Sequence, residues 1–467
     1  MNRFVKVVAT VGLAVGILLP LLTGAKEVPA TTDPIKAMLN SVETYQLSNG
    51  LKVLMLQDHS APVVTVQFWV KTGSRNEAPG ITGISHLFEH MMFRGSVKYG
   101  PEEHARLVKR YGGECNAFTT EDETVFFETI ASDQLELVLH LEAERFANLK
   151  LDSTVLEEER KVVSEERRER TDNNLFGNAR EQLIINFYKS STYAWPVIGW
   201  MHDIMHYTVP QIQEYHRLHY PPNNVVGIIV GDFESADAKK LLDKYWGQIP
   251  SGPTPPQPDM FEIPQHGERR VLLKRQAELP MLFAAYHIPP ETDPDIPALE
   301  VLSKVLSHGQ SSRLYQRLVY KEQAARFAGG SVDDHIGPSI FMFYLGMKQG
   351  KPIEDGEKSL WEEVERLRNE SITENELIKA KNQNEAEMIG GLSKTFERAQ
   401  TLGEYEIGYG DYKKFGEEAD AVSKVTAADV QRVAKKYLDP DQRTVLIVVP
   451  TQETENADPA TMQKGSH

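Results

Sequence analysis

The 467-residue sequence contains a single cysteine, Cys115, so no disulfide can form within the chain. It also has fewer basic than acidic residues: 51 Lys and Arg compared with 67 Asp and Glu, which gives a formal net charge of -16 at pH 7. Because nucleic-acid binding needs clustered positive charge, this balance argues against a nucleic-acid partner. Hydrophobic residues make up 40% of the chain and charged residues 25%, as in soluble globular proteins, and the length predicts two or more domains.

The N-terminus has the pattern of a secretory signal peptide. Two basic residues precede an apolar run over residues 7–22, and the small residues Thr-Gly-Ala follow it. We expect a signal peptide over residues 1–25, cleaved after Ala25 or, alternatively, after Ala30. An uncleaved membrane anchor is the competing interpretation, but the run contains a proline and falls short of the roughly 20 residues that a spanning helix needs. The mature protein is therefore expected in the periplasm or secreted, without a stable membrane anchor.

The sequence HLFEH at residues 86–90 has the parts of a hydrolytic zinc site. His86 and His90 are four positions apart, so on a helix their side chains lie on one face, with Cβ atoms about 5 to 6 Å apart. This spacing lets two imidazoles bind one metal ion. Glu89 lies on the same edge and could face a water molecule at the metal. The order H-x-x-E-H is the inverted zincin motif, in which the Glu acts as general base.

The neighbouring residues of this motif are apolar, which predicts a helix buried on nearly all sides. They are Ile84, Leu87, Phe88, Met91 and Met92. Burying two histidines and a glutamate without partners costs several kcal/mol, and a metal ion or a cleft would offset this cost.

A charged segment at residues 155–170, VLEEERKVVSEERRER, supplies a candidate for the third ligand. Most such runs are solvent-facing, but here an amphipathic stripe falls at i, i+4, i+7 and i+11: Val155, Glu159, Val162 and Glu166. We therefore expect Glu159 and Glu166 to point inward, one as a zinc ligand and one as a carboxylate that holds a histidine or the water. The other charged residues, including Arg167, are expected mostly to face solvent.

HLFEH together with ERKVVSEE, which contains Glu166, resembles the pitrilysin (inverzincin) family of zinc metallopeptidases. Within that family, the sequence is similar to the bacterial relatives of the mitochondrial processing peptidase beta subunit. The resemblance covers nearly the whole mature chain. It implies that His86, His90 and Glu166 bind Zn²⁺ and that Glu89 is the catalytic base. It also implies that Glu159 supports the ligand residues without binding the ion itself.

Residues 112–127, GGECNAFTTEDETVFF, alternate as a strand after a Gly-Gly turn, and they resemble the substrate-binding edge strand of the family. The resemblance implies that Asn116, Ala117 and Phe118 present main-chain groups to an extended peptide, a form of strand addition. Cys115 lies beside them. A redox role is one interpretation, and a small buried hydrophobe in a strand is the one we favour.

An internal repeat divides the mature chain. Seven residues recur at a constant offset of 218 positions: Thr208, Ile212, Gln213, Pro222, Ile228, Ile229 and Val230 match Thr426, Val430, Gln431, Pro440, Leu446, Ile447 and Val448. Self-similarity at this long period predicts two domains of the same fold. A segment dense in Pro and Gly separates the copies. We expect domains at residues 41–245 and 269–450, a linker at 246–268, and a polar tail at 451–467.

In the first domain, hairpin-linked strands precede helices, which favours an α+β fold with helices on one face of a mainly antiparallel sheet. The repeat extends this prediction to the second domain. The resemblance implies that two such domains face each other around a cleft.

The second domain has no H-x-x-E-H motif, so one metal site per chain is expected. Family members that work alone carry an Arg and, seven residues later, a Tyr in this half. Tyr320 and Phe327 occupy the matching positions here, and none of the nearby arginines, Arg313, Arg317 and Arg326, falls in register. We therefore expect a homologous partner subunit that supplies the Arg and Tyr, although a homodimer is possible.

The sequence thus predicts a zinc-dependent endopeptidase that acts on peptides or small unfolded polypeptides outside the cytoplasm, as the catalytic subunit of a dimer. The alternative is a non-catalytic assembly or scaffold subunit, because some members of the superfamily have become structural parts of larger complexes. Such members usually lose metal residues, and all four are present here. This constellation favours the enzyme.

Overall fold

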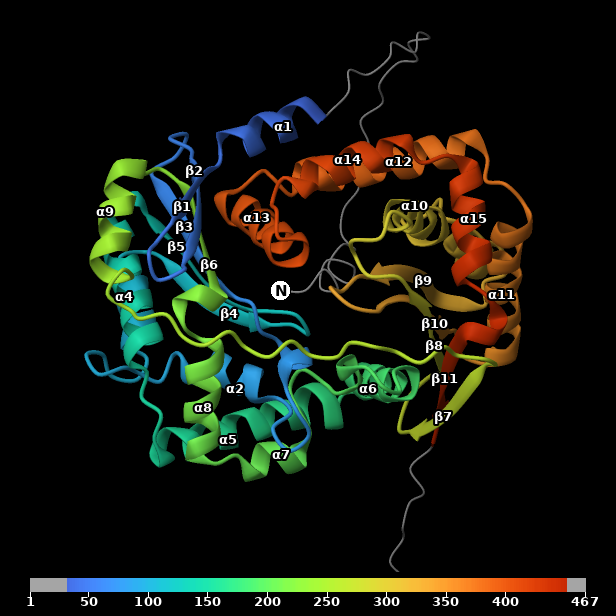
Figure 1. Cartoon of the computed structure of the whole chain (residues 1–467). Coiled ribbons are helices and arrows are strands. Elements are labelled where there is room, and N and C mark those ends of the chain that lie inside the picture. Colours follow the sequence, from blue (N-terminus) through green and yellow to red (C-terminus); the bar gives the residue numbers. More distant parts are fainter. Residues whose placement is uncertain (1–31, 452–467) are drawn as a thin grey trace, which may run out of the picture.

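The computed structural model describes residues 32–451 and consists of two β-sheets with helices around them (Figure 1). The predicted signal peptide and nearly all of the predicted polar tail lie outside the described residues. Among the helices of residues 32–451, none is both long enough and apolar enough to cross a bilayer.

The first sheet has six strands in the order β1-β2-β6-β3-β5-β4. Its strands are β1 (Glu43–Gln46), β2 (Lys52–Gln57), β3 (Val63–Val70), β4 (Glu114–Thr119), β5 (Thr124–Ala131) and β6 (Val225–Gly231). Only β2 and β6 pair in parallel, and every other pair is antiparallel. Strand β4 is at the edge of the sheet, as expected for the segment after the Gly-Gly turn.

The second sheet repeats this path with five strands in the order β7-β11-β8-β10-β9. They are β7 (Arg269–Arg275), β8 (Met281–Ile288), β9 (Ala325–Asp333), β10 (Ser339–Met347) and β11 (Arg443–Pro450). Strand β11 pairs in parallel with β7 and antiparallel with β8, just as β6 pairs with β2 and β3. The two strands with this role, β6 and β11, are those that the 218-residue repeat relates.

Helices flank each sheet. The first half of the chain contains α1 (Thr32–Ser41), α2 (Ile84–Met91), α3 (Glu103–Arg110), α4 (Leu135–Asn148), α5 (Ser153–Arg167), α6 (Leu175–Phe187), α7 (Met201–His206), α8 (Val209–His219) and α9 (Ser235–Tyr245). The second half contains α10 (Ile296–Ser307), α11 (Ile353–Asn369), α12 (Glu374–Gly390), α13 (Thr395–Tyr409), α14 (Lys414–Lys424) and α15 (Ala427–Tyr437). The α+β fold with two mainly antiparallel sheets is therefore confirmed.

Alternate residues of one strand contribute to two different cores. In β2, Val53 and Met55 pack with the helices of the first half, whereas Leu54 and Leu56 pack with α1, α13 and α14. The side-chain period of two in a strand explains this division. Both faces of the first sheet are thus covered, and the second face is covered largely by a helix from the other half of the chain.

The exchange of helices is reciprocal. Helix α13 of the second half lies against β3 and β6 of the first sheet, and α6 of the first half lies against β7, β8 and β11 of the second (Figure 1). Gly403 makes the first contact possible, because a Cβ at this position would lie 2.1 Å from the Trp69 ring. The sequence predicted helices on one face of each sheet and did not predict that the opposite face receives a helix from the other half.

A buried polar cluster also joins the two halves, around Asp122 in the turn between β4 and β5. The Asp122 carboxylate accepts a hydrogen bond from the Tyr193 hydroxyl at 2.6 Å and lies 2.8 Å from Nε of Arg75. From the second half, His335 Nδ1 lies 3.6 Å away, and the Ile336 backbone N–H donates at 3.3 Å. Burial alone would lower the pKa of His335, but its bond to Asp122 and the surrounding carboxylates raise the pKa to about 10.

This cluster predicts a pH-dependent contribution to stability. The folded pKa of His335 lies above its ordinary value of about 6.5, so the stabilisation is complete below about pH 6.5 and is lost as the pH rises towards 10. We predict that His335→Gln lowers the free energy of unfolding near neutral pH by about 1 to 3 kcal/mol and flattens its pH dependence between 6.5 and 10. Denaturant titrations at a series of pH values measure both effects.

His266→Gln is the control, because His266 is exposed in the segment before β7. It should retain the wild-type pH dependence. If the His335 variant had the same pH dependence as the wild type, the assigned role of His335 would be wrong.

Candidate metal centre

The start of α2 is fixed by contacts from the turn just before the helix and from a distant segment around Gly199. The buried Glu77 carboxylate accepts hydrogen bonds from the backbone N–H groups of Gly83, at 2.6 Å, and Ser85, at 2.8 Å. These N–H groups lie in the first turn of the helix, where no carbonyl group of the helix itself can accept their hydrogen bonds. Gly83 (φ +87°) packs face to face with Gly199 (φ +82°), and a Cβ on Gly83 would lie 2.3 Å from the Ile198 carbonyl oxygen. The Trp-rich segment 192–204 therefore holds the helix that carries the HLFEH motif.

Helices α2 and α5 bring His86, His90 and Glu166 together. His86 Nε2 lies 3.7 Å from one carboxylate oxygen of Glu166, and His90 Nε2 lies 3.0 Å from the other. Each of the three residues offers a donor atom within 4.8 Å of the others. Two donors that each lie about 2 Å from a tetrahedral zinc ion are about 3.3 Å apart, so these separations match a shared ion.

The chemistry of this donor set also fits a zinc ion. Burial lowers the pKa of His86, so its imidazole is neutral, as a ligand must be, and its buried Nδ1 has no hydrogen-bond partner. Burial would raise the pKa of Glu166, but the two histidines and Arg170 lower it to about 2, which keeps the carboxylate ionised. Arg170 Nη1 lies 2.6 Å from this carboxylate on a side chain that is 74% exposed, so it can move aside for an ion.

Glu159 lies behind His90. One carboxylate oxygen is 3.6 Å from His90 Nδ1, and the other accepts a hydrogen bond from Arg94. The side chain is only 1% exposed. A carboxylate on the far nitrogen of a ligand histidine orients its ring and fixes which nitrogen faces the metal. Burial would lower the pKa of His90, but the nearby carboxylates of Glu159 and Glu166 raise it to about 9. An ion that binds His90 therefore has to displace a proton from its imidazole.

Glu89 connects the histidine helix to the edge strand. The Thr119 hydroxyl, at the end of β4, donates a hydrogen bond of 2.7 Å to the Glu89 carboxylate. Asn116, Ala117 and Phe118 lie on the same strand, at the edge of the first sheet. Within residues 32–451, no strand pairs with the outer side of β4. The three candidate peptide-binding residues therefore lie on the strand that reaches Glu89.

Cys115 is half-buried in the same strand, and burial raises the pKa of its thiol to about 12. At neutral pH the group is therefore a thiol and a poor nucleophile. This agrees with the interpretation of Cys115 as a small packing residue.

Two expectations for α5 were wrong. Val162, expected on the inward stripe, is 40% exposed, whereas Arg167, expected in solvent, is 5% exposed. The buried face turns towards Arg160 and Val163 because α7 packs against this side of α5. Arg167 is paired with the Glu181 carboxylate at 2.9 and 3.0 Å, and it donates to the Gly199 carbonyl. The sequence could not show this compensation, since Glu181 comes from α6.

A second cluster with ligand-type side chains lies in the core of the first half. His104 Nε2 is 2.9 Å from Glu128 and 3.7 Å from Glu142, and all three residues are buried. The Arg145 guanidinium pairs with both carboxylates and already supplies the positive charge. Burial lowers the pKa of His104 to about 3 and raises that of Glu142 well above its usual range. This cluster is a neutralised structural network and does not need a metal ion.

The second half places Tyr320 in solvent, 67% exposed, at the end of a short π-helix (Tyr315–Lys321). Phe327 in β9 packs against the rings of Phe176 and Tyr344, with centroids 6.4 and 6.2 Å apart. Two of the three nearby arginines bind carboxylates: Arg313 pairs with Glu376, and Arg317 pairs with Glu322, Glu362 and Glu363. Neither of them occupies the position of Tyr320, where self-sufficient family members are expected to carry an Arg.

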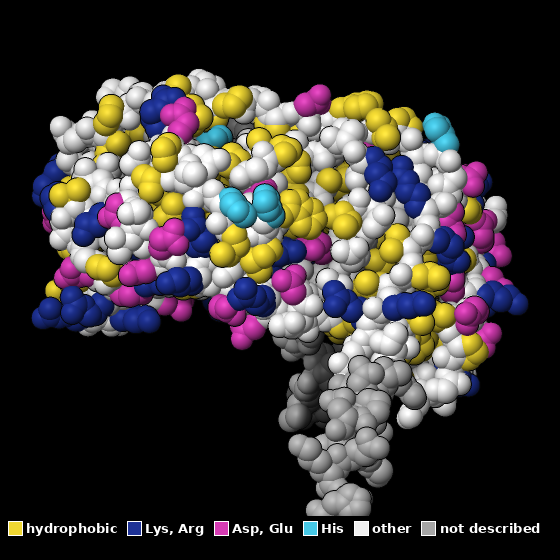
Figure 2. All heavy atoms as spheres, turned by 90° about the horizontal axis from the view of Figure 1, so that it is seen from below, with side chains coloured by type: hydrophobic (Ala, Val, Ile, Leu, Met, Phe, Trp, Pro, Cys, Tyr) yellow, Lys and Arg dark blue, Asp and Glu magenta, His cyan; other side chains and the backbone are white. Residues whose placement is uncertain are grey.

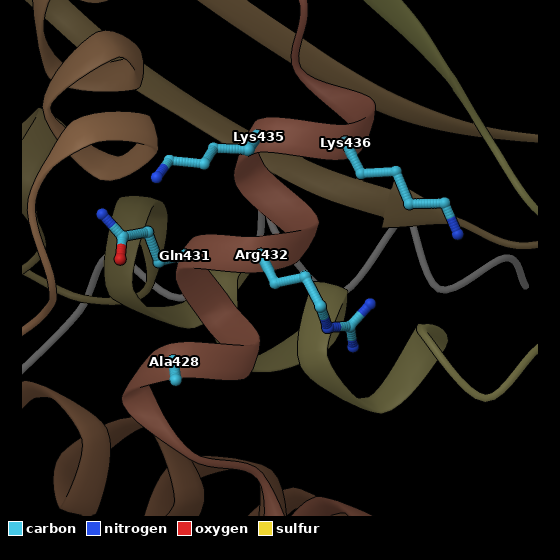
Figure 3. Close-up of a pocket in the computed structure, with 5 residues that line it drawn as sticks. All are labelled: Ala428, Gln431, Arg432, Lys435 and Lys436. Atoms are coloured by element: carbon cyan, nitrogen blue, oxygen red, sulfur yellow. The ribbon is translucent and has the colours of Figure 1, made fainter.

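A shallow hollow on the second half lies along α15 and is lined by Ala428, Gln431, Arg432, Lys435 and Lys436 (Figure 3). Arg432 and Lys436 each pair with Asp295, at 2.6 and 2.8 Å. Lys435 points to the opposite side of the helix. The basic side chains therefore do not converge on one ligand, and the hollow contains none of the predicted site residues.

Comparisons with known proteins identify the family. Residues 52–199 match "Insulinase (Peptidase family M16)", and residues 206–384 match "Peptidase M16 inactive domain". The zinc protease PqqE of Helicobacter pylori is 31% identical over 417 residues, which cover 87% of this chain and 93% of that protein. The chain therefore belongs to peptidase family M16, and the resemblance seen in the sequence is confirmed.

Other relatives agree with this assignment. A probable mitochondrial-processing peptidase subunit beta of Arabidopsis thaliana is 22% identical, over 87% of this chain and 78% of that protein. The crystal structure of a protease from Helicobacter pylori superposes with a TM-score of 0.84 at 31% identity and covers 88% of this chain and 99% of that chain. The periplasmic protease PqqL from Escherichia coli shares the fold, with a TM-score of 0.74 at 17% identity over 88% of this chain and 48% of that one.

The glycine contact below α2 predicts a measurable effect on stability. Gly83→Ala places a Cβ in a left-handed conformation against the Ile198 carbonyl, whereas Gly80→Ala has the same strain at φ +95° but no atom within 4 Å. We expect Gly83→Ala to lower the free energy of unfolding by at least about 1 kcal/mol more than Gly80→Ala, because overpacking adds to strain. Equal losses in the two variants, measured by denaturant titration, would contradict the proposed packing.

Proposed function

We propose that this chain is a zinc-dependent endopeptidase that hydrolyses peptides or small unfolded polypeptides outside the cytoplasm. The observation that carries the proposal is the approach of His86, His90 and Glu166 within reach of one ion, beside Glu89 and next to an edge strand. The names of the relatives as zinc proteases support zinc as the metal. The alternative role, a non-catalytic scaffold subunit, would leave this buried constellation without a purpose.

In this proposal His86, His90 and Glu166 hold the ion, with Glu159 orienting His90 and Arg94 holding Glu159. Zinc, when bound, polarises a peptide carbonyl and makes an adjacent water more acidic. Glu89 accepts a proton from that water and passes it to the departing amine. The hydrogen bond from Thr119 fixes one oxygen of Glu89 and leaves the other for proton transfer.

Strand β4 is the proposed binding site for the peptide. Backbone N–H and C=O groups at Asn116, Ala117 and Phe118 would pair with an extended substrate, which becomes an additional strand of the first sheet. Because main-chain groups provide the affinity in this mode, the substrate must be unfolded locally. This supports peptides and small unfolded polypeptides as the substrate class.

A dimer and an extracytoplasmic location complete the proposal. Tyr320 and Phe327 stand where self-sufficient members of the family carry Arg and Tyr, so we infer a homologous partner subunit that supplies these groups, with a homodimer as the second possibility. The signal-peptide pattern of residues 1–25 supports a periplasmic or secreted protein. The relative PqqL is a periplasmic protease.

Substitution of Glu89 separates catalysis from metal binding. We expect Glu89→Gln to bind zinc as the wild type does, because it is not a ligand, and to lose peptide hydrolysis by at least about a hundredfold, the usual contribution of a positioned base. Glu166→Ala should lose both zinc and activity. Zinc content by atomic emission and cleavage of a peptide library measure the two properties on the same samples.

Glu165→Ala is the matched control, since Glu165 precedes Glu166 on α5 and its side chain is 72% exposed. It should keep one zinc per chain and full activity. A Glu89→Gln variant with zinc and undiminished hydrolysis would exclude Glu89 as the base. Normal zinc content in Glu166→Ala would exclude Glu166 as a ligand.

The partner requirement has its own test. We expect the isolated wild-type chain to cleave peptides slowly and the variant Tyr320→Arg/Phe327→Tyr to be at least about tenfold faster, because it regains groups that bind and polarise the substrate. Tyr320→Leu/Phe327→Leu is the control, because it removes the rings without adding these groups. An isolated wild-type chain as fast as its complex with any partner would show that no partner is needed.

A further inference from the structure

Helix α7 presents four potential metal donors on one surface strip. Met201, His202, Met205 and His206 occupy adjacent positions at i, i+1, i+4 and i+5, which lie on one side of a helix. Both histidines are exposed, Met201 is half-buried, and Met205 is 48% exposed. Figure 2 shows the face of the molecule seen from below, with two neighbouring histidine side chains near its centre. None of these residues belongs to the proposed zinc site.

The two histidines are arranged like a ligand pair. Their ring centroids are 4.4 Å apart, compared with 4.8 Å for His86 and His90. His206 Nδ1 lies 2.6 Å from the His202 carbonyl oxygen. A carbonyl oxygen only accepts hydrogen bonds, so Nδ1 carries a proton and Nε2 is the nitrogen that faces a metal ion. This bond also fixes the ring, as backbone carbonyls do for metal-binding histidines.

The helix itself is held firmly from its inner side. The Asp203 carboxylate accepts hydrogen bonds from Gly80 N–H, Thr82 N–H and the Thr82 hydroxyl, at 2.7 to 3.2 Å. On α5, Arg160 donates to the carbonyl oxygens of Ile204 and Tyr207, at 3.1 and 2.5 Å. The backbone that carries the four donor residues is therefore held in place, which reduces the entropy cost of ordering them around an ion.

We propose that Met201, His202, Met205 and His206 form an accessory binding site for copper(I). Thioether sulfur is a soft ligand that selects copper(I), and imidazole also suits copper. The four side chains bring no carboxylate or thiolate, so they suit a soft monovalent ion better than hard dications, which prefer charged oxygen ligands. Lying on the surface, the site can load and release its ion without opening the fold.

The experiment uses the full mature chain, already loaded with zinc, and anaerobic titration with copper(I) in competition with a chromophoric chelator. We expect the wild type to bind one copper(I) beyond its zinc. His202→Gln/His206→Gln should weaken copper(I) binding at least tenfold. Met201→Leu/Met205→Leu should also weaken copper(I) binding at least tenfold but leave the affinity for nickel(II), which needs only the imidazoles, within about twofold.

His266→Gln is the control, because His266 is exposed but lies outside α7. It should bind copper(I) as the wild type does. Circular dichroism and zinc content of each variant show that its fold and metal centre are intact. The proposal is overturned if the wild type takes up no copper(I) beyond its zinc, if the double histidine variant keeps its affinity, or if the double methionine variant is unchanged.

Discussion

The contact between α2 and α5 is the constraint on which the proposed chemistry depends. The two histidines are neighbours through helical spacing alone, but Glu166 reaches them only because α5 packs against α2. A shift of about 1 Å between these helices would spoil the donor separations of 3.0 and 3.7 Å. Much of the surrounding structure secures this contact: Glu77 caps α2, Gly83 meets Gly199, and Arg167 and Glu181 neutralise each other beside α5.

The two halves of the chain share one strand path but differ in chemistry. Strands β6 and β11 have equivalent places in their sheets, yet only the first half carries the histidine helix. Each half also covers a sheet of the other, with α6 and α13 as the exchanged helices. The second half therefore packs directly against the sheet that carries β4. The Asp122 cluster adds a polar connection in the turn beside that strand.

Local patterns predicted much of this from the sequence. Helical spacing predicted that His86, Glu89 and His90 share one edge of a helix, the amphipathic stripe predicted that Glu159 and Glu166 point inward, and the repeat predicted two related sheets. Residues that act across distant segments could not be found in this way. Thr119 donates to Glu89 of α2 from strand β4, and Arg167 of α5 is buried because Glu181 of α6 pairs with it. A charged residue gives no sequence signal for a partner supplied by another element, so its burial is visible only in the folded chain.

Crystals of the mature chain grown with zinc, measured on both sides of the zinc absorption edge, would show whether His86, His90 and Glu166 share one ion. We expect one strong anomalous peak about 2 Å from His86 Nε2, His90 Nε2 and a carboxylate oxygen of Glu166. Arg170 should then be displaced from that carboxylate. The absence of a peak among these three residues in a correctly folded chain would show that they do not form a zinc site.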